Sequence, residues 1–517
     1  MAEASANAGP APLKGGALAL TSIALALGTF MQVLDTTIAN VSIPTIAGDL
    51  GVSTDQGTWV ITAFAVSNGI GVPVTGWLMQ RYGIVRTFVG SVLMFTLMSF
   101  LCGVAWNLPS LVLFRILQGA ASGPMIPGSQ ALLIMIFPRS KQATALAIWS
   151  MTTLVAPITG PILGGYISDN ISWPWIFLIN VPVGLLCAFV CWRFLNSRET
   201  PTRKLPIDTV GFGLLIVWVG AFQIMLDTGK NADWFSSPAI VVEALVAIIG
   251  FIAWVIWEVG EKHPIVDLSL FRSSNFAFGT IAMCVAFAIF FANAVLLPLW
   301  LQTQMHYNAT WAGLVMAPSG VVAVFLTPFI ARILGRIDAR LTATVSLFAF
   351  AASFWMRSDF TPDVDFVSLM IPMLVMGIGM STFFISMVTI CLNGVAPQQV
   401  PQATGLTNFA RISAGSFAAS LVTTWWDQRE ALHQSRIAES TGGVTDPLWS
   451  QALHALQHQG MSLAQSAAAL AHQVQYQAVL LATLDLFRLS AWVTLACIPL
   501  VWLTHRAVGG GRHAAAD

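Results

Sequence analysis

The feature that most constrains the fold is a series of apolar runs, each about 20 residues long, along almost the whole chain. A helix of about 20 apolar residues spans the roughly 30 Å hydrocarbon core of a bilayer. The 517 residues are 56% hydrophobic and only 9% charged, which excludes a soluble enzyme. The sequence therefore predicts an all-α polytopic membrane protein. Fourteen spans are expected, at 17–40, 57–79, 87–106, 110–137, 142–167, 174–195, 209–228, 237–258, 275–301, 311–333, 341–356, 366–393, 402–426 and 481–505.

The distribution of Lys and Arg predicts the orientation of these spans. An even number of spans places both termini on one side of the membrane. With the N-terminus inside, sixteen of the 23 Lys and Arg lie in inner segments, and two, Arg115 and Arg411, lie within spans. Because positive charge concentrates on the cytoplasmic side, both termini are expected in the cytoplasm. The five on the outer side are Lys230, Arg357, Arg429, Arg436 and Arg488.

Two connections are longer than the others. Residues 196–208 are charged, contain Pro201 and Pro206, and are expected to form a cytoplasmic linker. Residues 427–479 are expected on the outside, and 448–470 alternate Ala and Leu with polar residues at helical spacing. One or two surface helices are therefore predicted there, either as a docking surface or as a solvated hairpin.

Two ionisable residues within spans are the first candidate functional groups, because a charge at the bilayer centre costs about 2.5–3.5 kcal/mol on insertion scales. Asp35 lies in the first span, towards its outer half. Apolar surroundings favour its protonated form, which suits a site that loads and releases a proton; the alternative is a structural carboxylate that caps local backbone. Arg115 stays charged and needs a carboxylate, carbonyl or water partner. It either controls the proton affinity of a carboxylate or ties two helices together.

The segment Ala156–Gly165 reads Ala-Pro-Ile-Thr-Gly-Pro-Ile-Leu-Gly-Gly within an apolar run. Pro and Gly disfavour an ordinary helix, but membrane helices tolerate them where neighbours satisfy the freed backbone groups. The four-residue spacing of Pro157 and Pro161, and of Gly160 and Gly164, puts each pair on one helix face. The pattern indicates either a closely packed helix or a kinked helix in a moving transporter.

Four motifs occur in order along the first half of the chain. They are 35–44 in the first span, 76–83 between the second and third spans, 115–119 in the fourth span, and 156–165 in the fifth. Together they resemble the major facilitator superfamily, and specifically its fourteen-span drug:proton antiporters of the EmrB type. Gln80 departs from the second motif, where the general pattern has an acid. The stretch Trp173–Gly184 is also similar to EmrB-like chains.

The resemblance implies a major facilitator fold of two six-helix bundles that rock about a central site. The bundles would be 1–195 and 259–517, joined by the linker 196–208 and two inserted helices at 209–258. It also implies a proton gradient as the energy source rather than a cofactor, and a periplasmic adaptor of the EmrA type with an outer-membrane channel. Asp35 and Arg115 would couple protons. Residues expected to serve conformational change are Gly76, Arg81, Gly83, Pro157, Gly160, Pro161, Gly164 and Gly165.

A substrate cavity is expected between the bundles. Its polar, aromatic and thioether groups suit lipophilic, neutral or weakly acidic compounds. Together with the resemblance, which implies an antiporter, this predicts proton-driven multidrug efflux across the bacterial inner membrane. Alternatives are export of an endogenous metabolite (fatty acid, siderophore or antibiotic), an uptake symporter, or a non-transporting receptor. The candidate lining residues are Gln32, Asn68, Gln118, Asn293, Met316, Phe384 and Arg411, the last of which lines the cavity or ties span thirteen to a partner.

No chemistry-bearing motif in the sequence points to an enzyme or a metal site. The six cysteines fall in apolar segments without a CxxC pair and are expected to be small buried hydrophobic residues. His454 and His458 are four residues apart, but no carboxylate or Cys accompanies them, so a metal site is not expected. The absence of a Walker sequence argues against ATP hydrolysis.

Overall fold

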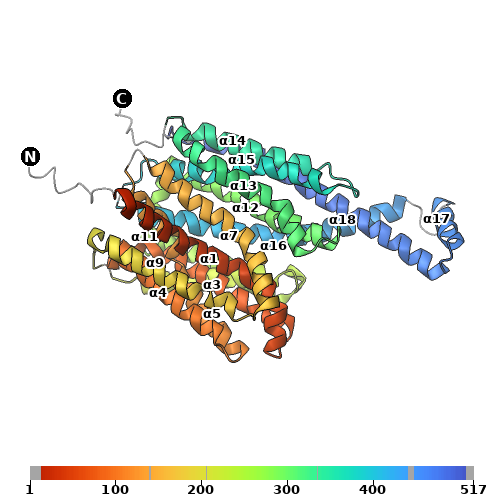
Figure 1. The fold of residues 1–517 in the computed structure, drawn as a ribbon, viewed down its shortest axis with the longest axis horizontal. Coiled ribbons are helices and arrows are strands. Elements are labelled where there is room, and N and C mark those ends of the chain that lie inside the picture. The colour runs from red at the N-terminus through yellow and green to blue at the C-terminus, as the bar shows by residue number, and fades with distance from the viewer. Residues whose placement is uncertain are drawn as a thin grey trace, which may run out of the picture.

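The computed structural model describes residues 13–138, 141–204, 206–334, 336–396, 398–440 and 447–507. The regular elements of these residues are all helices, most of which lie side by side in an elongated bundle (Figure 1). The longer helices are α1 (Gly15–Asp49), α3 (Trp59–Tyr82), α4 (Ile84–Gly103), α5 (Leu108–Ser122), α6 (Met125–Ile136), α7 (Gln142–Asn170), α9 (Asn180–Leu195), α10 (Thr209–Thr228), α11 (Pro238–Gly260), α12 (Ser274–Thr303), α13 (Ala309–Leu334), α14 (Ala339–Arg357), α15 (Phe366–Cys391), α16 (Val400–Ser440), α17 (Pro447–His458) and α18 (Leu463–Ala496). Short helices are α2 (Thr54–Gly57), α8 (Trp175–Leu178) and α19 (Ile498–Trp502).

The helices match the predicted spans, and the chain is an all-helical polytopic membrane protein. Among the described residues, eleven helices are long and apolar enough to cross a membrane. The other three expected spans are also helical: 142–167 lies in α7, 402–426 lies in α16, and 110–137 is divided between α5 and α6. The break in 110–137 was not expected. It falls at Gly123 and Pro124, where proline has no N–H to continue the helical ladder.

The helices form two packed sets with a third pair beside them. In the first set, α1 packs on α6, α7 and α9, while α5 packs on α3 and α4. In the second set, α15 packs on α12, α13 and α14, and α16 packs on α12 and α18. Helices α10 and α11 pack on one another, and α10 also contacts α3 and α16. The two sets meet where α7 contacts α13 and α15, and where α16 contacts α3 and α6.

The two ends of the bundle differ. We call the end where α1 begins the terminus side; there Ala339 N–H, at the start of α14, donates to the carbonyl of Ala507 at 2.7 Å. We call the opposite end the hairpin side, because α16 and α18 project beyond the bundle there and carry α17 (Figure 1). Helix α16 has 41 residues and α18 has 34, both longer than the about 20 residues that a bilayer requires. Helices therefore occupy the region in which surface helices were predicted.

Glycines allow close helix contacts. A Cβ at Gly160 of α7 would lie 2.7 Å from Thr37 Cβ of α1, so the two backbones approach through this glycine. A Cβ at Gly123 would overlap the backbone of Gly71 in α3. By contrast, nothing lies within 4 Å of a Cβ built on Gly165. The side chains of Pro157 and Pro161 lie outside the described structure, and Gly164 is buried.

We predict that Gly160→Ala destabilises the protein, because the added methyl forces α7 away from α1. Overpacking of this kind costs about 1–3 kcal/mol. Gly165→Ala is the matched control on the same helix, since its methyl meets open space and alanine favours the helix. The apparent melting temperature of the detergent-purified protein should fall for Gly160→Ala alone. Equal values for both variants would contradict the close contact.

Candidate functional site

Asp35 and Arg115 form a buried ion pair between α1 and α5. Their side chains are 0% and 1% exposed, and Arg115 Nη1 lies 2.5 Å from Asp35 Oδ2. The structure thus brings together the two charges that the sequence placed in separate spans. Each charge alone is costly to bury in an apolar interior, and pairing the two charges lowers that cost.

Neutral side chains complete the hydrogen bonding of the pair. Asp35 Oδ1 accepts from Gln118 Nε2 at 3.2 Å and from Asn180 Nδ2 at 3.1 Å. Asn180, the first residue of α9, also donates to Ser99 Oγ at 3.0 Å. Each oxygen of the buried Asp35 carboxylate therefore has a hydrogen-bond partner. Gln118, predicted to line the substrate cavity, lies in this network and is fully buried.

Arg115 also contacts residues other than Asp35. Its Nε donates to the carbonyl of Val60 in α3 at 3.0 Å, and its Nη1 donates to Gln118 Oε1 at 2.8 Å. Its guanidinium carbon lies 4.1 Å from the ring centroid of Phe64. Such cation–π contacts contribute about 2 kcal/mol or more when desolvated. The pair therefore ties α1 to α3, α5 and α9.

Sequence reasoning missed Asn180 and Ser99. In the sequence, Asn180 belongs to the stretch Trp173–Gly184 that resembles the family, and Ser99 lies in an apolar run. The one available signal was that Asn180 is a polar residue at the start of a span, which is also where ordinary interfacial residues lie. Their role depends on helix packing that a local pattern does not contain.

The motif 76–83 lies at the terminus side, where the two sets of helices touch. A Cβ at Gly76 of α3 would lie 3.0 Å from Gln402 Cα of α16, so this glycine allows the contact. Gly83 has φ 91°, a left-handed value that favours glycine, and it separates α3 from α4. The guanidinium of Arg81 lies over the rings of Trp77 and Tyr82, at 5.4 and 5.7 Å.

An acid beside this motif comes from a distant part of the chain. Gln80 replaces the expected acid, but the carboxylate of Glu199 accepts hydrogen bonds from the backbone N–H groups of Val85 and Arg86, both at 2.9 Å. A carboxylate at the first turn of α4 satisfies free N–H groups and interacts favourably with the helix dipole. No local sequence pattern predicts this contact, because Glu199 lies 114 positions after Val85.

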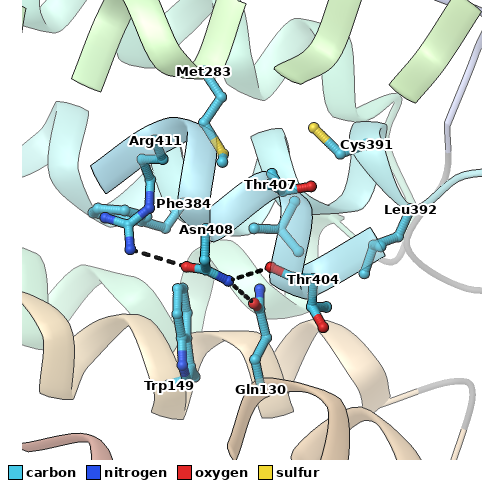
Figure 2. Close-up of a pocket in the computed structure, with 11 residues that line it drawn as sticks. Gln130, Trp149, Met283, Phe384, Cys391, Leu392, Thr404, Thr407, Asn408 and Arg411 are labelled. Atoms are coloured by element: carbon cyan, nitrogen blue, oxygen red, sulfur yellow. Dashed lines mark hydrogen bonds between the residues drawn. The ribbon is translucent and has the colours of Figure 1, made fainter. Parts of the chain in front are cut away.

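A small cavity lies between the two sets of helices (Figure 2). Gln130 of α6 and Trp149 of α7 face residues of α12, α15 and α16 across it. Asn408 joins the two sides, because its Nδ2 donates to Gln130 Oε1 at 2.8 Å (Figure 2). Among the predicted cavity residues, Phe384 and Arg411 line this space, and Arg411 Nη2 donates to Asn408 Oδ1 at 3.0 Å.

The other predicted cavity residues lie elsewhere. Gln32 is buried in α1, and its Oε1 has no hydrogen-bond partner in the described chain. Asn68 donates to Ser122 Oγ at 2.5 Å, and Asn293 donates to Ser490 Oγ at 2.9 Å. Met316 packs on a hydrophobic cluster of the second set of helices. A cavity shared by all of these residues therefore stays a prediction.

A larger, open and apolar cavity of about 610 Å³ lies beside α1. It is bordered by α1 on one side and by the end of α6 and the first half of α7 on the other. Its wall is almost entirely apolar. The residues that line it are Gly15, Leu18, Ala19, Ser22, Ile23, Ala26, Leu27, Phe30, Phe137, Ile148 and Thr152.

Comparison with known proteins identifies the family. The sequence profile of the Major Facilitator Superfamily matches residues 25–419, more than half of the chain. The chain belongs to the major facilitator superfamily. As a member, it is a secondary transporter in the membrane rather than an enzyme, and the predicted fold class is confirmed.

Three curated relatives of this transporter cover nearly its whole length. Multidrug export protein EmrB of Haemophilus influenzae is 46% identical over 96% of this chain and 98% of its own. Fatty acid resistance protein FarB of Neisseria gonorrhoeae is 45% identical over 97% and 99%. Multidrug export protein EmrB of Escherichia coli is 44% identical over 97% and 98%. The resemblance to EmrB-type transporters is thereby confirmed.

We predict strong coupling between Asp35 and Arg115 in a double-mutant cycle. Arg115→Gln leaves a buried carboxylate without its counter-ion and should cost about 3–5 kcal/mol. The double variant Asp35→Asn with Arg115→Gln should cost less than the sum of the single variants, because no lone charge remains. Thermal unfolding in detergent measures all four proteins. Additive effects would show that the two charges do not stabilise one another.

Proposed function

We propose that this protein is a proton-driven antiporter that exports hydrophobic or amphipathic compounds across the bacterial inner membrane. Two relatives are named multidrug export proteins, which supports this direction of transport. The large apolar cavity beside α1 suits lipophilic compounds. Export of an endogenous metabolite such as a fatty acid is a second candidate of the same class, favoured by the name of the relative FarB.

The buried pair of Asp35 and Arg115 carries the proposal for proton coupling. A proton that reaches Asp35 from outside neutralises the carboxylate and removes its attraction for Arg115. The contact that ties α1 to α5 then weakens, which allows the helices to rearrange. When Asp35 releases the proton to the cytoplasm, the charged pair forms again. The membrane potential contributes about 2.3 kcal/mol per charge for each 100 mV.

We propose that substrate access alternates by rocking of two six-helix bundles, 1–195 and 259–517, joined by 196–208 and the inserted helices at 209–258. The terminus side is the cytoplasmic side in this proposal. The contact of Gly76 with Gln402, and the hydrogen bond from Asn408 to Gln130, support a conformation closed to the cytoplasm. Opening to the cytoplasm would have to break both.

We further propose that the transporter works in a tripartite pump. The hairpin side would face the periplasm, where α17 and the ends of α16 and α18 project beyond the bundle (Figure 1). These helices would bind a periplasmic adaptor of the EmrA type, which connects to an outer-membrane channel. A projecting helical hairpin offers an adaptor surface that does not compete with the lipid-facing helices.

We predict that Asp35→Asn abolishes drug-driven proton release in proteoliposomes. The asparagine oxygen still accepts from Gln118 and Asn180, but the amide cannot carry a proton. Because Arg115 loses its counter-ion, the variant should also be less stable than the wild type. Asp49→Asn is the matched control, since Asp49 lies on the same helix, is exposed, and accepts from Trp173 Nε1 through an oxygen that asparagine retains. Size-exclusion chromatography checks folding. Normal transport by Asp35→Asn would refute the assignment.

We predict that replacing residues 436–468 by a short Gly/Ser linker removes adaptor binding but preserves transport. The deletion keeps His433 and Asp485, whose side chains lie 2.8 Å apart at the base of the hairpin. Co-purification with a co-expressed periplasmic adaptor of the EmrA type should be lost. Proton-driven uptake into inverted vesicles should be unchanged. Retained co-purification would place the adaptor surface elsewhere.

A further inference from the structure

Arg411 differs from the other functional arginine in having no counter-ion. Within the described residues, no carboxylate pairs with Arg411, whereas Arg115 pairs with Asp35. Arg411 is 3% exposed, its hydrogen bond to Asn408 is to a neutral oxygen, and its Nε has no partner in the described structure. A buried guanidinium with an unused donor is unfavourable, so this site favours an anion.

The surroundings of Arg411 form a built site rather than an isolated charge. Its guanidinium carbon lies 4.5 Å from the ring centroid of Phe287 and 5.5 Å from that of Phe384. Trp149 stands edge-on to Phe384, with the ring centroids 6.1 Å apart. The side chain of Arg411 lines the cavity at the contact between the two sets of helices (Figure 2). Charge and aromatic rings thus occur together at the place where the proposed bundles would separate.

The cavity is too small for a substrate in this conformation. Its volume is about 10 Å³, which is room for about one water molecule. A substrate could therefore enter only after the two sets of helices part. Separation would expose Arg411 together with the aromatic rings beside it, and no ionic partner on the described protein would compete for its charge.

We propose that Arg411 is the anion-recognition group of the substrate site and binds the carboxylate of amphipathic weak acids. The apolar part of such a substrate would lie against Trp149, Phe287 and Phe384. The guanidinium suits this task because it presents several N–H donors in one plane and stays charged. This inference rests on the proposed export function and names one of its substrate classes.

Asn408 links this recognition to the contact between the bundles. Its Oδ1 accepts from Arg411, while its Nδ2 donates to Gln130 of α6 and to the carbonyl of Thr404, both at 2.8 Å (Figure 2). A substrate carboxylate is a stronger acceptor than this amide oxygen. Binding therefore displaces Asn408 Oδ1 from Arg411, which changes the hydrogen bonding of the residue that bridges the two sides.

The test compares dodecanoate with dodecanamide, which have the same chain but differ in charge. Equilibrium binding to the detergent-purified protein gives both affinities at pH 8, where dodecanoate is ionised. Arg411→Gln should weaken dodecanoate binding roughly 10- to 100-fold, because a hydrogen bond to a charged group is lost. The affinity for dodecanamide should change by less than about twofold. Equal losses for both ligands, or no loss for dodecanoate, would overturn the proposal.

Arg357→Gln is the matched control. Arg357 is also a fully buried arginine that pairs with no carboxylate among the described residues, and its Nε likewise has no partner there, but it does not line the cavity. Its replacement should leave the ratio of the two affinities unchanged. An equal change of this ratio in both variants would show a general effect of removing a buried charge, and would overturn the proposal.

A second variant covers the case in which Arg411→Gln fails to fold. Asn408→Ala removes the neutral oxygen that competes for Arg411, so the ratio of dodecanoate to dodecanamide affinity should rise severalfold. An unchanged or lower ratio would count against the proposal. Transport in proteoliposomes separates the two levels of inference: if the wild-type protein binds dodecanoate through Arg411 but exports neither ligand, the export function is wrong and the anion site stands.

Discussion

Every charge inside this bundle must find its partners within the protein, because the surrounding hydrocarbon offers none. The ion pair of Asp35 and Arg115 meets this requirement in full: Gln118 and Asn180 bond the carboxylate, and the Val60 carbonyl bonds the guanidinium. These contacts draw α1, α3, α5 and α9 together. In the proposed transport cycle, neutralisation of Asp35 would remove its attraction for Arg115 and loosen the packing of these helices.

The same constraint applies to the buried arginines Arg115 and Arg411, which have different partners in the two halves of the protein. In the first half, Arg115 has an acid of the protein as its partner. In the second half, Arg411 rests on aromatic rings and a single amide oxygen. Rings stabilise a cation less completely than a carboxylate does, so Arg411 retains capacity to bind an anion. Proton and substrate would thus act on two separate arginines, one in each half, on either side of the contact between α6 and α16.

Much of the fold could be predicted from the sequence, because an apolar run of about 20 residues has few alternatives to a membrane helix. Asp35 and Arg115 stood out for a similar reason, since a charge in such a run is expensive. Neutral polar residues carry no comparable signal, so the contributions of Asn180 and Ser99 depend on helix packing that only the structure shows. Glu199 contacts α4 from far along the chain. Arg357, predicted to lie in an outer connection, is instead the buried last residue of α14, because its stem and guanidinium pack on Phe354 and Phe487.

Helix α16 has a mechanical consequence. It runs without interruption from Gln402 and Asn408, at the contact with the first set of helices, to Ser440 on the projecting hairpin. Its 41 residues make a rod about 60 Å long, so a tilt of about 10° at one end displaces the other by roughly 10 Å. A small tilt at the contact between the two sets of helices would therefore produce a large displacement of the projecting hairpin. A protein bound to the hairpin would then move with the contact between the two sets of helices, without touching the substrate.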